Sequence, residues 1–111
     1  MTQARTSSVE PVMRASGATS LKLVRAWVIE TLGPLAADDD HSSMLRDTLR
    51  VFLQEGGSFK AAAERLTLHK NTVQYRVRKA EESLGRPIGK DRLHIELALL
   101  AIQWLGATVL Q

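Results

Sequence analysis

Residues 59–84 read FKAAAERLTLHKNTVQYRVRKAEESL, and this stretch decides the fold. Helical spacing of its apolar residues predicts a short helix over 59–66, a three-residue turn, and a longer helix over about 70–84. Two helices joined by so short a turn cross at a steep angle, which requires a small residue in the first and apolar residues inside the second. Ala63 is small and Val73 is apolar at the required places. The pattern predicts a helix-turn-helix.

The longer of these two helices has two unlike faces when it is drawn at about 100° per residue. One narrow stripe is wholly apolar and consists of Val73, Val77, Ala80 and Leu84. The opposite side and its flanks are polar or aromatic and consist of Asn71, Gln74, Tyr75, Arg78, Lys79 and Glu82. Residues 70–80 include four basic residues and no acid. The apolar stripe is typical of a core contact, and the other face is expected in solvent.

The polar face has the chemistry that double-stranded DNA requires. In the major groove Arg hydrogen-bonds guanine O6 and N7, Asn or Gln hydrogen-bonds adenine N6 and N7, and apolar groups contact the thymine methyl. The candidates for base contacts are therefore Asn71, Gln74, Tyr75 and Arg78. Basic residues at the groove edges neutralise phosphates and release counterions. The candidates for phosphate contacts are Lys70, Thr72, Arg76 and Lys79, with Lys60 and Arg86 on either side of the helix.

Three further helices are expected around the motif. Apolar periodicity places them at Leu21–Leu32, Met44–Glu55 and about 91–105, and glycines stand at the ends of the first two. No stretch shows a strand pattern, so we expect an all-α, compact five-helix, Fis-like helix-turn-helix domain without a wing. It would occupy residues 21–111, with the motif at 58–85. Residues 1–20 are expected to form a flexible tail or linker.

The last helix is apolar nearly all round, so it must be buried on two sides. One stripe consists of Leu93, Leu97, Leu100 and Trp104, and another of Ile95, Leu99, Ile102 and Leu105. The second side is covered either by Leu21–Leu32 of the same chain or by a second copy of the chain. In a homodimer the helices Leu21–Leu32 and Leu93–Leu105 would form the interface. The sequence pattern fits both arrangements, the cover within one chain and the cover by a second copy.

Several runs of residues resemble a known family. They include Gly56-Gly57-Ser58, Leu84-Gly85-Arg86-Pro87-Ile88 and, most specifically, His69-x-Asn71-Thr72-Val73-x-Tyr75-Arg76. These runs are similar to the C-terminal helix-turn-helix domain of PucR/CdaR-type bacterial transcriptional regulators, over residues 27–106. The resemblance implies binding to double-stranded DNA in the cytoplasm, at the bacterial nucleoid. It also implies that the domain is the output end of a longer regulator with an upstream sensor domain.

Two residues depart from the expected patterns, and a third has two readings. Thr67 lies in the turn where the family often has Gly; a positive φ there would strain Thr by roughly 1–2 kcal/mol. Arg76 lies near the core edge, where helix-turn-helix proteins usually have an apolar residue. We expect it to brace the two helices through Glu64 or to bind phosphate. For His69, a role in capping the helix and closing the turn is favoured over a DNA contact.

Composition and charge exclude several classes of function. The chain has no cysteine and three widely separated histidines, so we expect no metal and no cofactor. No acid/base set suggests an enzyme. The longest apolar stretch, Leu97–Leu110, is interrupted by Gln103 and is shorter than the ~20 residues that a bilayer needs. No membrane partner is therefore expected.

Positive charge is concentrated in the second part of the chain. Residues 1–40 have four basic and five acidic residues, whereas residues 41–111 have eleven basic and seven acidic ones. This asymmetry favours a polyanionic partner for the second part. Two alternatives to DNA binding remain: a protein-interaction or dimerisation module with a helix-turn-helix fold, and an RNA-binding regulator.

Overall fold

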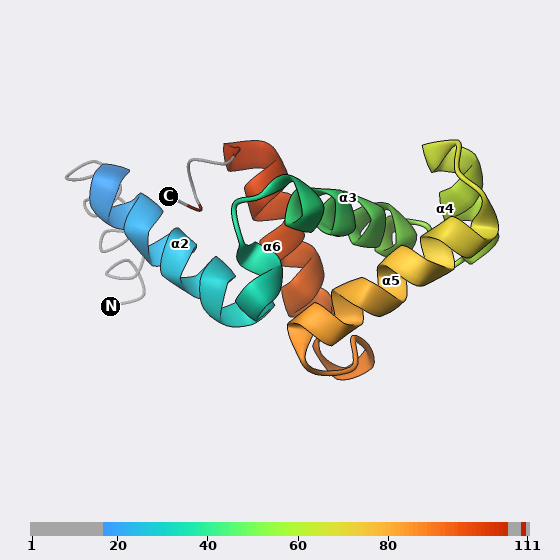
Figure 1. The fold of residues 1–111 in the computed structure, drawn as a ribbon. Helices are drawn as coiled ribbons and strands as arrows, with labels where there is room; N and C mark the ends of the chain where they lie inside the picture. Colours follow the sequence, from blue (N-terminus) through green and yellow to red (C-terminus); the bar gives the residue numbers. More distant parts are fainter. Residues whose placement is uncertain (1–16, 107–109, 111) are drawn as a thin grey trace, which may run out of the picture.

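The computed structural model describes residues 17–106 and residue 110. This part of the chain folds into five α-helices and two short 3-10 helices, without a strand (Figure 1). The helices are α2 (Gly17–Leu32), α3 (Asp40–Gln54), α4 (Phe59–Leu66), α5 (Lys70–Leu84) and α6 (Arg92–Leu105). The 3-10 helices are η1 (Gly33–Ala36) and η2 (Gly89–Asp91). The all-α, five-helix prediction is confirmed.

The observed bounds differ from the expected ones mainly outside the motif. α4 and α5 begin and end where the sequence predicts. α2 begins at Gly17, so residues 17–20 are helical although we assigned them to the tail. The rest of that predicted tail lies outside the described residues. η1 and η2 were not predicted, because Gly33-Pro34 and the glycines near residue 89 indicate only the end of a helix.

The helices pack as two groups that share α3. α3 contacts α4 and α5, while α6 contacts α2 and α3. α4 and the beginning of α5 lie at one end of the molecule, and α2 lies at the other (Figure 1). The core runs between the groups and includes the fully buried side chains of Val28, Leu32, Leu35, Leu49, Val73 and Ile95. Because Leu35 belongs to η1, this short helix is part of the core and not only a connection.

A buried arginine fastens η1 to α3. One terminal nitrogen of Arg46 donates hydrogen bonds to the backbone oxygens of Leu35 at 2.8 Å and Ala37 at 2.7 Å. Burial lowers the pKa of Arg46, and the carboxylates of Asp47, Asp38 and Asp39 oppose this shift. An arginine remains protonated even so. The contact joins segments nine and eleven residues apart, so it fixes the path of the chain between α2 and α3.

Asp39 caps the beginning of α3. Its carboxylate accepts a hydrogen bond from the backbone N–H of Ser42 at 2.7 Å, which satisfies one of the free donors of the first turn. This backbone hydrogen bond is the main reason that the pKa of Asp39 lies below its ordinary value of 3.8. The cap therefore stabilises the fold fully above pH 3.8 and ceases to do so as the pH falls through the lower, folded-state pKa.

We expect Asp39→Asn to keep the cap at neutral pH and to reduce the loss of stability in acid, since Asn caps helices without titrating. Urea unfolding at pH 7 and at pH 3 measures the difference. Asp40→Asn is the matched control, because Asp40 is an exposed neighbour in the first turn that does not provide the cap. Equal acid sensitivity of the wild type and Asp39→Asn would show that the cap contributes nothing to the pH dependence.

Candidate nucleic-acid interface

The turn of the helix-turn-helix is closed by backbone and side-chain hydrogen bonds. Ser58 caps α4 by accepting from the N–H of Ala61 at 3.0 Å. At the other end of α4, Thr67 has the left-handed conformation, with φ 57° and ψ 47°. The N–H of Leu68 then donates to the backbone oxygen of Ala63 at 2.9 Å. The chain is thus turned within three residues and enters α5 at a fixed angle.

His69 begins α5 as its cap. Its Nδ1 accepts a hydrogen bond from the backbone N–H of Asn71 at 3.1 Å. The imidazole must present an unprotonated Nδ1 to make this contact. The capping role that the sequence favoured for His69 is confirmed.

Thr67 is the one non-glycine residue with positive φ among the described residues. A β-branched side chain is strained there by roughly 1–2 kcal/mol, while glycine loses part of this advantage through its larger entropy when unfolded. We expect Thr67→Gly to raise the free energy of unfolding by about 1 kcal/mol. Urea unfolding measures the change, and Thr67→Ala, which keeps a Cβ, should gain clearly less. A loss of stability in Thr67→Gly would contradict this account.

α5 presents two faces, as the sequence predicted. Val73, Val77, Ala80 and Leu84 are all buried, and the helix packs on α3, α4 and η1. On the opposite side Asn71, Tyr75 and Arg78 are exposed, and Gln74 is half-buried at the edge. The four candidate base-contacting residues therefore lie on the accessible side of a helix that the core holds in place. A helix with this exposure fits the width of the major groove.

Tyr75 lies close to two cations of α5, Arg78 and Lys79. Its side chain is 50% exposed, with the guanidinium carbon of Arg78 5.3 Å and Nζ of Lys79 5.6 Å from the ring centroid. Lys79 also forms an ion pair with Glu82 at 3.4 Å. Cation–π contacts of this kind hold a long side chain near the ring. This cluster is not among the features expected from the sequence, although the spacing of three and four residues along one helix indicates it.

The candidate phosphate-contacting residues have different surroundings. Lys60 and Lys70 are exposed, and Thr72, Arg76 and Lys79 are half-buried at the sides of the motif. In the described part of the chain Arg76 forms neither a hydrogen bond nor an ion pair with Glu64, so the expected bracing contact between these two is absent. Its contact with phosphate stays a prediction.

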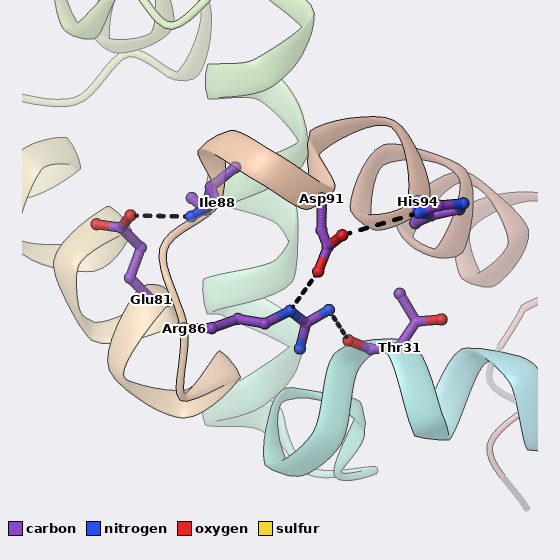
Figure 2. Close-up of polar contacts among 6 residues, drawn as sticks. All are labelled: Thr31, Glu81, Arg86, Ile88, Asp91 and His94. Carbon is purple, nitrogen blue, oxygen red and sulfur yellow. Dashed lines mark hydrogen bonds and ion pairs between the residues drawn. The ribbon is translucent and has the colours of Figure 1, made fainter.

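The guanidinium of Arg86 forms hydrogen bonds within the protein. Its Nε donates to Oδ2 of Asp91 at 2.8 Å, and a terminal nitrogen donates to the backbone oxygen of Thr31 at 2.8 Å (Figure 2). Oδ1 of Asp91 lies 4.0 Å from Nδ1 of His94. Together these residues connect the end of α2 to the segment between α5 and α6. A phosphate contact by Arg86 stays a prediction, and it would have to share a guanidinium that already makes two internal hydrogen bonds.

No group of three or more His, Cys, Asp or Glu residues is placed to hold a metal ion among the described residues. No helix among those residues is both long and apolar enough to cross a membrane.

A helix-turn-helix with a buried apolar stripe and an exposed polar face defines the class of helix-turn-helix DNA-binding domains. The sequence pattern of the PucR C-terminal helix-turn-helix domain matches residues 45–101. The chain belongs to this family, and it is the kind of DNA-binding domain found in PucR-family transcriptional regulators. It is a regulatory domain and not an enzyme, as the sequence indicated.

Several curated proteins share this region. An uncharacterized protein in the pkwA 5' region of Thermomonospora curvata is 44% identical over 61 residues, which cover 55% of this chain and 34% of that protein. The transcriptional activator PmfR of Paenarthrobacter nicotinovorans is 36% identical over 69 residues, 62% of this chain and 15% of PmfR. The purine catabolism regulatory protein of Bacillus subtilis (strain 168) is also 36% identical over 69 residues, 62% of this chain and 13% of that protein.

The chain spans about a third or less of the length of these relatives. No solved structure gave a significant match.

Proposed function

We propose that this chain binds double-stranded DNA sequence-specifically and that the N-terminal half of α5 enters the major groove. The observation that carries the proposal is the exposure of Asn71, Tyr75 and Arg78 on a helix whose opposite face is fully buried. A buried stripe fixes the rotation of the helix, so the same three side chains always face outward. Fixed, outward-facing donors and acceptors are what reading base edges requires.

The proposed contacts divide by chemistry. Asn71, Gln74, Tyr75 and Arg78 contact base edges, because they occupy the exposed face and its edge. Lys70, Thr72, Arg76 and Lys79 contact phosphates on either side of the groove, with Lys60 on α4 beyond them. The acids Glu81 and Glu82 lie in the C-terminal half of α5, which leaves the groove.

The test is selection of bound duplexes from a random pool by the full chain. We expect enrichment of a short motif, with binding that weakens steeply as salt rises. Competition by structured RNA at equal nucleotide concentration should be weaker than by the selected duplex. Preference for the RNA would favour an RNA-binding regulator. Failure to bind either polymer or heparin would favour a protein-interaction module.

Lys79→Ala should weaken binding to selected and random duplexes alike, because a phosphate contact is independent of sequence. The slope of log K against log salt should flatten by about 1. Lys90→Ala is the matched control, since Lys90 is an exposed lysine in η2 outside the motif. An unchanged slope in Lys79→Ala would remove this residue from the phosphate contacts.

Two further parts of the proposal concern partners. The described residues include one helix-turn-helix, and such domains commonly read two half-sites about 34 Å apart as a two-fold symmetric pair. We propose that this chain acts as a homodimer on such a site, in the bacterial cytoplasm. The relatives are several times longer than the matched region, which supports an upstream sensor domain in a longer regulator.

A further inference from the structure

His69 has two ring nitrogens, and the cap of α5 uses only one of them. Its Nδ1 accepts the hydrogen bond from the backbone N–H of Asn71 at 3.1 Å, so this nitrogen carries no proton. In a neutral imidazole the proton then lies on Nε2, which becomes a hydrogen-bond donor. The cap therefore fixes both the tautomer and the orientation of the ring.

The donor on Nε2 has no partner within the described part of the chain. His69 is exposed, and its Nε2 forms neither a hydrogen bond nor an ion pair with any described residue. The two nitrogens of an imidazole point in widely different directions. A ring whose Nδ1 faces the first turn of α5 thus directs its Nε2–H away from that turn and into solvent.

The acceptors of His69 are already engaged. Its backbone oxygen accepts from the N–H groups of Thr72 and Val73 at 3.0 and 3.2 Å, in addition to the contact at Nδ1. The next residue, Lys70, adds further donors, because neither its backbone N–H nor its exposed side chain has a partner within residues 17–106. The outward groups at this point are therefore donors only.

Donors without an acceptor match a phosphate better than a base pair. Phosphate oxygens only accept hydrogen bonds, whereas each base pair presents donors together with acceptors in the major groove. The place fits as well, since His69 directly precedes the exposed residues Lys70 and Asn71. α4 and the beginning of α5 form one end of the molecule, so this donor lies beside the surface proposed to read DNA (Figure 1).

We propose that His69 donates from Nε2–H to a DNA phosphate while its Nδ1 caps α5. One imidazole then both positions the helix and holds it on the duplex. The inference rests on the proposed function, because it adds a contact to the same interface. The cap and a DNA contact stood as alternatives in the sequence, but in the structure they use different nitrogens and do not compete.

His69→Ser separates the two roles. Serine caps a helix through its hydroxyl and has no group that reaches outward, so the variant should unfold at a urea concentration no lower than the wild type. Its affinity for the selected duplex should fall about 5- to 50-fold, the effect of losing one hydrogen bond to a charged group. The slope of log K against log salt should not change, because a neutral donor releases no counterion.

Two further variants support this comparison. His69→Thr also keeps a capping hydroxyl and should behave like His69→Ser. His41→Ser is the matched control, since His41 is an exposed histidine in the first turn of α3, and α4 follows the other end of that helix. It should bind the selected duplex like the wild type.

Two measurements identify the atoms of the contact. In proton–nitrogen correlation spectra of the free chain at about pH 8, where an ordinary imidazole is neutral, His69 should carry its proton on Nε2. That proton should be observed directly only in the complex, where a phosphate protects it from exchange with water. A methylphosphonate at one position of the duplex, which removes the charged oxygen, should weaken the wild type and not weaken His69→Ser further.

The outcomes separate this inference from the proposed function. Equal affinities of His69→Ser and the wild type for the selected duplex overturn the contact and leave the proposed function intact. A proton on Nδ1 in the free chain, a flattened salt slope in His69→Ser, or coupling of that variant to a base change instead of a phosphate overturns it as well. A wild type that binds no duplex rejects the proposed function together with the contact.

Discussion

Replacing Arg46 with Met will lower the free energy of unfolding by about 2–4 kcal/mol. The guanidinium of Arg46 supplies both hydrogen bonds to the backbone oxygens of Leu35 and Ala37, at 2.8 and 2.7 Å. Met fills similar space but donates nothing, so two carbonyl groups at the packed edge of η1 lose charged donors. A buried acceptor without a donor costs about 1–3 kcal/mol. This cost applies to the oxygen of Leu35, and the part-buried contact to Ala37 adds a smaller loss.

Urea unfolding measures this effect, and two variants control it. Arg50→Met alters a neighbouring arginine of α3 that forms an ion pair with Asp47 at 3.3 Å. Because the Asp47 side chain is 64% exposed, the loss of this pair should change stability by less than about 1 kcal/mol. Arg46→Lys keeps a charge that can reach one oxygen and should fall between the two. Equal losses for Arg46→Met and Arg50→Met would show that the hydrogen bonds to η1 do not stabilise the fold.

Arg78→Ala is expected to cost about 1–3 kcal/mol of binding to the selected duplex, a factor of roughly 5 to 150. Arg78 is exposed on α5, and its guanidinium lies 5.3 Å from the ring centroid of Tyr75. Stacking on the ring holds the planar group in place before DNA arrives, and a pre-oriented fork suits guanine O6 and N7. Random duplex should be bound only slightly less well, so the ratio of specific to non-specific binding falls.

Titration of matched and mismatched duplexes measures that ratio. Arg78→Lys keeps the charge but not the two-pronged geometry, and it should lose most of the selectivity at one base pair. Arg65→Ala removes an exposed arginine of α4 that pairs with Glu55 at 3.2 Å, and it should leave base selectivity unchanged. If Arg78→Ala keeps the selectivity of the wild type, Arg78 does not read a base.

The helix-turn-helix could be predicted from the sequence because its determinants are local. Ser58 and His69 act as caps, Gly85 ends α5 with positive φ, and the buried stripe recurs every three or four residues. Each of these signals operates within a turn or two of helix. The exposure of Asn71, Tyr75 and Arg78 followed from the same periodicity.

The parts that could not be predicted depend on contacts between distant segments. Arg46 resembles a surface residue on an amphipathic helix, and only the position of η1 makes it a buried donor. The charge of Arg86 makes it a phosphate candidate, which stays a prediction, and no local pattern indicates its hydrogen bonds to Thr31 and Asp91. The two faces of α6 were recognised as apolar, but their separate surroundings needed the packing of α2.

The packing of α2 on α6 has a consequence for synthesis on the ribosome. The apolar residues Val28 and Leu32 are made roughly 65 residues before Ile95 and Leu99, which share their core. At translation rates of about 5–20 residues per second, this part of α2 lacks its contacts with α6 for roughly 3–13 seconds. The apolar face of α2 is therefore fully covered only after α6 has left the ribosomal exit tunnel.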